Sequence, residues 1–186
     1  MEQGEDRRVR RTRAALRAAL AELVVTQSYD SLTVAKICDA ADVGRSAFYQ
    51  HFKGKDDLLR SGFAKLEADL AAAEVEPGKS FSAGFFAHAL RHRELYRALT
   101  HSQAAPIATA AVRRILESRA RKLLAPESPA GVPRNLRAAL LVDVLISLVR
   151  WWLDRESPQA VDKIDAMFHE LVSGILGTQE STDNPC

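Results

Sequence analysis

The sequence is poor in cysteine and has no long apolar run. It contains only Cys38 and Cys186, and the second is the last residue, so a disulfide scaffold is not indicated and a reducing compartment is expected. The most apolar stretch, residues 138–149, is too short to cross a bilayer and contains Asp143. The beginning of the chain lacks the apolar segment of a signal peptide. We therefore expect a soluble, cytoplasmic protein with no membrane partner.

The sequence also lacks the motifs that mark common enzyme and metal sites. It has no Gly-rich phosphate loop and no G-x-S-x-G motif, and its Ser, His and Asp residues are scattered. His88 and His92 are four residues apart, which permits a pair of metal ligands on a helix, but no third ligand or HExxH pattern accompanies them. We expect no metal, no cofactor and no catalytic residues. An enzyme acting on a small molecule is the weaker alternative.

The residues that are present form a helix-turn-helix pattern between positions 33 and 59, TVAKICDAADVGRSAFYQHFKGKDDLL. Residues 33–40 have the spacing of a short helix whose first residue, a threonine, can accept a hydrogen bond at the N-cap. Residues 41–44 supply a tight turn, and residues 45–52 form a second short helix that Gly54 ends. In a helix-turn-helix, the second helix enters the major groove of DNA.

The second of these helices has one apolar and one polar face. Phe48 and Phe52 are four residues apart, so they share a face and can anchor the helix to a core. The opposite face offers groups that can reach base edges and phosphate oxygens. We expect base contacts from Arg45, Ser46, Tyr49 and Gln50, and phosphate contacts from Thr33, Tyr49, His51 and Lys55. The alternative is an ordinary helical hairpin whose polar face is only solvated.

This ordered set of residues resembles the DNA-binding signature of the tetracycline-repressor (TetR) family of transcriptional regulators. The matching elements are the threonine that begins the first helix, the turn of small residues, the Phe-Tyr-x-His-Phe run at 48–52, and Lys55 followed by acidic residues and two leucines. The close resemblance covers residues 1–60. Two positions depart from the family pattern. Members usually have Gly in place of Asp42 and Ser or Thr in place of Gly44, so the second helix has a weaker N-cap.

An arginine cluster precedes the motif. The net charge is only +2, but its excess lies within the first 60 residues. The cluster belongs to a helix predicted for residues 7–27, and it consists of Arg7, Arg8, Arg10, Arg11, Arg13 and Arg17. Cations beside a helix-turn-helix suit contacts with DNA phosphates, although a solvated and partly disordered N-terminal tail would have the same composition.

The remainder of the chain has helical periodicity and no strand alternation, so the fold class is all-α. With the three helices described above, we expect about nine helices. The other six are expected at residues 55–74, 80–91, 93–101, 107–124, 136–153 and 158–177. We expect a helix-turn-helix DNA-binding domain at 1–54, a helical ligand-binding and dimerisation domain at 55–177, and a disordered tail at 178–186.

The predicted helix at 136–153 carries apolar residues almost all round, so it needs burial on more than one side, and the last predicted helix also carries many apolar residues. In a chain of 186 residues, a second copy can supply that burial through a four-helix interface. We expect this interface to contain Leu145, Ile146, Val149, Trp152, Phe168, Leu171 and Ile175. The alternative is that both helices simply belong to the core of one protomer.

The resemblance to the TetR family also implies a cavity for an unknown small-molecule effector in the second domain. Residues that could line it, and that could equally be core, are Phe85, Phe86, His88, Tyr96, Leu99 and Ile115. The predicted helix 55–74 would link this cavity to the DNA-reading helix.

We interpret the chain as a ligand-responsive repressor, not an enzyme, that binds a palindromic operator in double-stranded DNA as a homodimer. A helical protein-interaction module without DNA binding is the other alternative.

Overall fold

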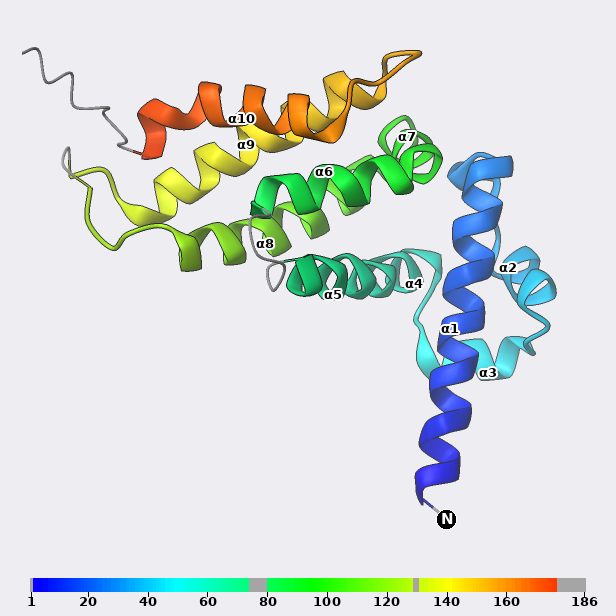
Figure 1. Cartoon of the computed structure of the whole chain (residues 1–186). Helices are drawn as coiled ribbons and strands as arrows, with labels where there is room; N and C mark the ends of the chain where they lie inside the picture. Colours follow the sequence, from blue (N-terminus) through cyan, green and yellow to red (C-terminus); the bar gives the residue numbers. More distant parts are fainter. Residues whose placement is uncertain (1, 74–79, 129–130, 177–186) are drawn as a thin grey trace, which may run out of the picture. The chain divides into compact units, whose positions relative to one another are not determined.

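A computed structural model of the chain describes residues 2–73, 80–128 and 131–176. Regular structure in these ranges is entirely helical, with no strand, so the all-α class is confirmed. None of the described helices is long and apolar enough to cross a membrane. Figure 1 shows the helices, which are α1 (Glu2–Thr26), the 3-10 helix η1 (Tyr29–Ser31), α2 (Val34–Ala41), α3 (Arg45–His51), α4 (Lys55–Gly62), α5 (Ala64–Ala73), α6 (Phe81–Arg91), α7 (Arg93–Thr100), α8 (Ala105–Leu123), α9 (Arg134–Leu153) and α10 (Val161–Leu176).

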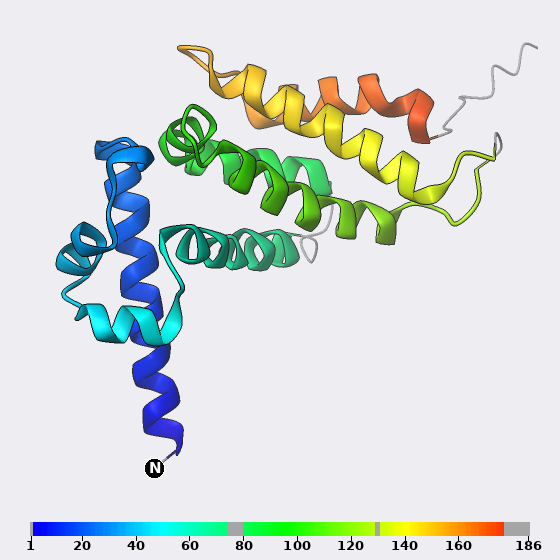
Figure 2. The same ribbon diagram turned by 180° about the vertical axis from the view of Figure 1, so that it is seen from behind.

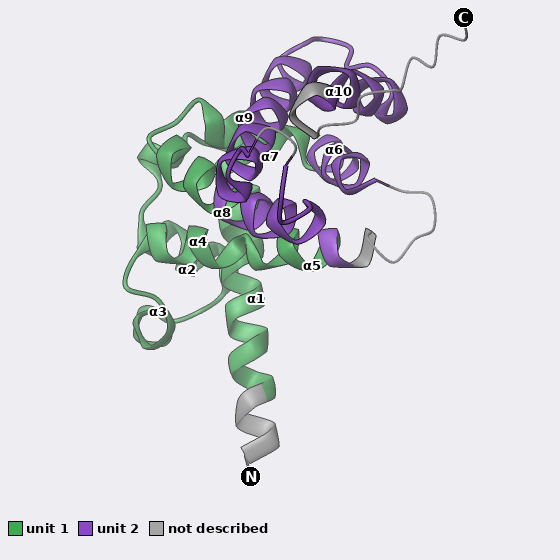
Figure 3. Cartoon of the chain, turned by 90° about the vertical axis from the view of Figure 1, so that its left-hand side faces the viewer, with its two compact units in different colours: residues 1–69, 92–112 green, residues 70–91, 113–186 purple. Residues whose placement is uncertain are grey.

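The chain divides into two compact units, which Figure 3 shows in different colours. Unit 1 consists of residues 1–69 and 92–112, and unit 2 consists of residues 70–91 and 113–186. Unit 1 therefore combines the helix-turn-helix with α7 and the beginning of α8. The functional domain boundary expected after residue 54 stays a prediction. The expected disordered tail lies outside the described residues.

Helix α1 is the centre of unit 1. It packs against α2, α4 and α7, while α2 also packs against α3. Leu16, Leu20 and Val24 are buried at intervals of four residues and form the apolar stripe of α1. The other buried members of this core are Tyr29, Leu32, Ile37, Cys38, Phe48, Phe52, Leu58, Leu59, Leu99, Ala104 and Ala108. One apolar cluster thus holds the helix-turn-helix, α4 and α7 together.

Unit 2 is built on contacts among α6, α9 and α10. Phe86 of α6 lies edge-on to Trp152 of α9 and to Phe168 of α10, with ring centroids 5.7 and 6.3 Å apart. At the start of α6, the buried hydroxyl of Ser82 donates a hydrogen bond to the Asp165 carboxylate of α10 at 2.5 Å. An aromatic cluster and a polar contact therefore join α6 to both C-terminal helices.

The helix expected over residues 55–74 is divided into α4 and α5, so the described residues contain ten α-helices instead of about nine. The division falls at Phe63, whose N–H bonds to the carbonyl of Arg60, three residues earlier. The preceding residue, Gly62, has a low helix propensity, which weakens the helix at this point. The expectation of one uninterrupted helix is therefore wrong.

Three other helix starts differ from those expected. Helix α8 begins at Ala105, which puts Pro106 in the first turn, where a missing N–H costs no intrahelical hydrogen bond. Helix α10 begins at Val161 and not directly after Ser157. The indole N–H of Trp152 donates a hydrogen bond to the carbonyl of Gln159 at 3.0 Å. This bond keeps the segment between α9 and α10 from joining α10. Helix α1 begins at Glu2, five residues before the expected start at residue 7, and the remaining helix boundaries agree with expectation to within two residues.

Candidate nucleic-acid interface

The turn between α2 and α3 is held by local hydrogen bonds. Helix α2 has an N-cap, because the Thr33 hydroxyl accepts a hydrogen bond from the N–H of Lys36 at 3.3 Å. The helix ends at Asp42, whose φ of 51° and ψ of 47° lie in the left-handed region. The N–H of Val43 then bonds to the carbonyl of Cys38 at 3.0 Å. Aspartate is among the few residues other than glycine that adopt this conformation, so the turn forms despite the departure from the family pattern.

Helix α3 is fixed by two buried phenylalanines. Phe48 is 0% exposed, Phe52 is also buried, and their ring centroids lie 5.7 Å apart. The N-cap is Gly44, and no side chain caps the helix, as its sequence predicted. Because α3 has only 7 residues, its position depends on this packing and not on helical stability of its own.

The predicted DNA-reading side chains lie away from this core. All four expected base contacts are exposed: Arg45, Ser46, Tyr49 and Gln50. The Tyr49 ring is 60% exposed and lies edge-on to Phe48 at 5.3 Å. Among the expected phosphate contacts, Thr33 is exposed and His51 is half-buried. One short helix therefore presents a guanidinium, a hydroxyl, a phenol and an amide, which are the groups that hydrogen-bond to base edges.

Lys55 does not have the environment expected of a phosphate contact. Its ammonium donates hydrogen bonds to the carbonyls of Tyr29 and Leu32 at 2.9 and 3.0 Å, and it lies 4.5 Å from the centroid of the Tyr29 ring. Beside it, the Tyr29 hydroxyl donates to the Asp56 carboxylate at 2.5 Å. Burial, together with the hydrogen bond to Asp56, raises the pKa of Tyr29 above its ordinary value. Lys55 therefore ties the start of α4 to η1.

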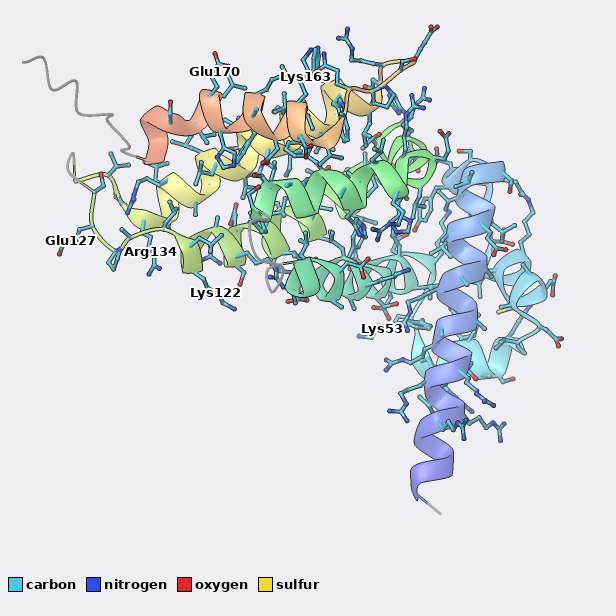
Figure 4. The ribbon with its side chains drawn as sticks, in the orientation of Figure 1. Lys53, Lys122, Glu127, Arg134, Lys163 and Glu170 are labelled. Atoms are coloured by element: carbon cyan, nitrogen blue, oxygen red, sulfur yellow. The ribbon has the colours of Figure 1, made fainter. Side chains whose placement is uncertain are left out.

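Lys53 is an exposed cation in the gap between α3 and α4. Its side chain is marked in Figure 4, and its backbone N–H donates to the Asp57 carboxylate at 3.0 Å. This hydrogen bond fixes the backbone just before α4 and leaves the ammonium available to a partner in solution. The sequence reasoning missed Lys53. Its position between the two helices was the only signal that could have indicated it.

Comparison with known proteins relates the helix-turn-helix segment to a known family. The profile for bacterial regulatory proteins of the tetR family matches residues 16–61, from the middle of α1 to α4. A curated relative, the HTH-type transcriptional regulator TcmR of Streptomyces glaucescens, is 38% identical over 72 residues, which cover 38% of this chain and 32% of TcmR. Residues 16–61 of this chain are thus similar to the DNA-binding segment of tetR-family proteins. Its match thus spans about a third of the length of that curated relative.

Solved structures share the fold of this chain. The TetR transcriptional regulator from Streptococcus agalactiae 2603V has a TM-score of 0.67 at 20% identity, covering 92% of this chain and 99% of that one. NalD, the secondary repressor of the MexAB-OprM multidrug efflux pump in Pseudomonas aeruginosa, has a TM-score of 0.63 at 19% identity, covering 90% and 98%. At these identities the likeness concerns the fold alone.

The residues expected to line an effector cavity belong to both units. Four are buried in unit 2: Phe85, Phe86, His88 and Ile115. Leu99 lies in the core of unit 1. Tyr96, also in unit 1, has a buried hydroxyl, and burial raises the pKa of this phenol. The cavity itself stays a prediction.

The residues expected at a dimer interface are partly core and partly surface. Four of them are buried in unit 2: Leu145, Val149, Trp152 and Phe168. Ile146 is half-buried, Leu171 is exposed, and the side chain of Ile175 lies outside the described residues. The exposed large apolar side chains of α9 are instead Leu136, Leu140 and Trp151. The interface itself stays a prediction.

We expect Lys55→Met to lower the free energy of unfolding by about 1–3 kcal/mol, because the carbonyls of Tyr29 and Leu32 lose a charged hydrogen-bond donor. Lys53→Met removes the same charge from an exposed position, and it should change this free energy by less than about 0.5 kcal/mol. Chemical denaturation followed by circular dichroism compares the two variants. Equal stability of both would show that the Lys55 ammonium does not hold η1 and α4 together.

Proposed function

We propose that this protein is a DNA-binding transcriptional regulator, a repressor that binds operator DNA in the cytoplasm. The observation that carries the proposal is α3, a short helix in which buried Phe48 faces the core and an exposed polar face is turned away from it. The groups on that face match the donor and acceptor patterns of base edges in the major groove. The family match over residues 16–61 supports the same function.

Within this proposal, the exposed residues divide into base readers and phosphate contacts. The Arg45 guanidinium can donate two parallel hydrogen bonds to a guanine, and the Gln50 amide can pair with an adenine. Thr33 at the start of α2 and Lys53 before α4 are exposed at the two ends of the motif and are assigned to phosphates. Lys55 is reassigned to positioning, because its ammonium is engaged within unit 1.

The proposed active species is a homodimer, because a two-fold symmetric dimer reads the two half-sites of a palindromic operator. Leu136, Leu140 and Trp151 recur along α9 at spacings that place them on one face of the helix. Leu171 is an exposed apolar residue of α10 in the same unit. Covering these side chains with a second copy would remove apolar surface from water and so stabilise the pair.

The proposed response to a small-molecule effector rests on the family resemblance. An inducer would stabilise the form whose two α3 helices are wrongly spaced for half-sites one helical turn apart. The helix expected at 55–74 is divided at Phe63 into α4 and α5. A movement caused by the inducer would therefore reach the DNA-reading helix through α4, which packs on α1. Linkage requires saturating operator to weaken effector binding by the same factor, so a ligand whose affinity the operator leaves unchanged is not an inducer.

Selection of bound sequences from random duplexes tests the proposed function. We expect a two-fold symmetric sequence to be enriched and its affinity to fall steeply with salt. Arg45→Ala or Gln50→Ala should cost about 1–3 kcal/mol on that sequence and relax the preference at one base pair. Binding that ignores sequence would overturn the proposal. Absence of DNA binding would favour a protein-interaction module, and turnover of a small substrate would favour an enzyme.

A further inference from the structure

The first half of α1 lies outside the core of unit 1. Helix α1 begins at Glu2, and among its residues from 7 onward, whose burial the structure describes, the first buried one is Leu16. Residues 2–15, here named the N-terminal arm, span about 20 Å at a rise of 1.5 Å per residue. In Figures 1 and 2 this part of α1 extends past α3, the helix that carries the predicted DNA-reading residues. The arm also precedes the segment matched by the tetR-family profile, which starts at residue 16.

The arm carries five arginines after three acidic residues, so its net charge is +2 and its cations lie between residues 7 and 13. Arg7, Arg8 and Arg11 are exposed, and Arg11 lies about one helical turn from each of the other two, so the three guanidinium groups gather on one side of the helix. Figure 4 shows nitrogen-tipped side chains around this part of α1. Clustered guanidinium groups repel one another, and phosphates are the partners that suit their planar donor geometry.

The base of the arm is attached to the end of the DNA-reading helix. The Arg13 guanidinium lies over the ring of Phe52, 5.6 Å from its centroid. Phe52 is buried and is the C-cap residue of α3. The base of the arm is therefore fixed beside the C-terminal end of α3, so a duplex bound to the exposed face of α3 would run close to the arm.

We propose that the N-terminal arm is a second DNA contact, in which Arg7, Arg8 and Arg11 bind phosphates beside the groove that α3 enters. This contact rests on the proposed function and adds to it a part that does not read sequence, because phosphate contacts position a protein without distinguishing bases. An acidic protein could also bind these arginines, but such a partner gives no reason for the arm to project past α3. The logarithm of DNA affinity falls with the logarithm of salt concentration, and each phosphate contact steepens this slope by about 0.9. Three contacts from each of two arms in a homodimer would therefore steepen it by up to about five.

The test compares two triple variants that lose the same charge. Arg7→Gln, Arg8→Gln and Arg11→Gln remove three of the arm's exposed cations and keep a good helix former at each position. Arg114→Gln, Lys122→Gln and Lys163→Gln remove three exposed cations of unit 2. Each full-length protein is titrated over a range of salt concentrations with the selected palindrome, carried on a duplex with flanking sequence on both sides. Hydroxyl-radical footprints are recorded on the same duplex, and circular dichroism checks that each variant is folded.

We expect the arm variant to bind at least tenfold more weakly at low salt, with a shallower salt dependence and fewer protected sugars, while its base preference is unchanged. The unit 2 variant should bind as the unsubstituted protein does. An arm variant with unaltered salt dependence and footprint would overturn the second contact, and so would one that changes its base preference. Failure of the unsubstituted protein to select any sequence would instead reject the proposed function, whatever the arm does.

Discussion

Phe48→Ala is expected to lower the free energy of unfolding by about 3–5 kcal/mol and to abolish specific DNA binding. Phe48 is 0% exposed and packs against Phe52, so its removal leaves a cavity behind α3. A helix of 7 residues has little stability of its own in water, and the position of α3 depends on this anchor. A loss of this size is a large fraction of the stability of a typical domain.

Tyr49→Ala is the matched control, because it removes the neighbouring ring from the exposed side of the same helix. Tyr49 is 60% exposed, so this change should cost less than about 1 kcal/mol of stability. If Tyr49 contacts DNA as proposed, the variant should still lose affinity for the selected duplex. Chemical denaturation and fluorescence-anisotropy titration measure the two effects separately. A Phe48→Ala protein with unaltered stability would mean that this ring does not anchor α3.

The local features of the helix-turn-helix were predictable because each depends on residues within one or two turns of the chain. The Thr33 cap, the left-handed Asp42 and the four-residue spacing of Phe48 and Phe52 follow from residue type and short spacing alone. The absence of a side-chain cap at Gly44 was predictable for the same reason. Such features need no knowledge of the rest of the fold.

The role of Lys55 was not predictable, because its partners are distant in the chain. The carbonyls of Tyr29 and Leu32 precede it by 26 and 23 residues. On sequence alone, Lys53 and Lys55 are two similar cations beside a DNA-reading helix, and the family resemblance pointed to the second. Only the position of η1 in the folded unit engages one lysine and leaves the other exposed.

The faces of α9 were not predictable either, because apolar residues surround this helix. Trp151 and Trp152 are adjacent in sequence, yet Trp152 is 0% exposed and donates a hydrogen bond to Gln159, whereas Trp151 is 44% exposed. The packing of α6 and α10 against α9 decides which ring is buried, and periodicity cannot report that packing. The interface expected from sequence therefore mixed core residues with surface residues.

Trp151→Asp is expected to raise the dissociation constant of the proposed homodimer at least about 100-fold while leaving the protomer folded. An unpaired carboxylate buried in an interface costs several kcal/mol, and a two-fold interface contains the substitution twice. The Trp151 ring is exposed, and its centroid lies 4.6 Å from the Arg155 guanidinium. It therefore contributes much less to the protomer core than the buried Trp152 does. Because one half-site contact alone is weak, affinity for the palindromic duplex should fall with dimerisation.

Two further variants separate loss of assembly from loss of folding. Val25→Asp places a carboxylate at another exposed apolar position, on α1 in unit 1, and it should leave the protein dimeric. Trp152→Ala should instead lower the free energy of unfolding by about 3–5 kcal/mol, because its ring fills the core beside Phe86. Sedimentation velocity gives the assembly state of each protein, and chemical denaturation gives its stability. If Trp151→Asp stays dimeric, the second copy does not cover this face of α9; if it unfolds as Trp152→Ala does, Trp151 belongs to the core.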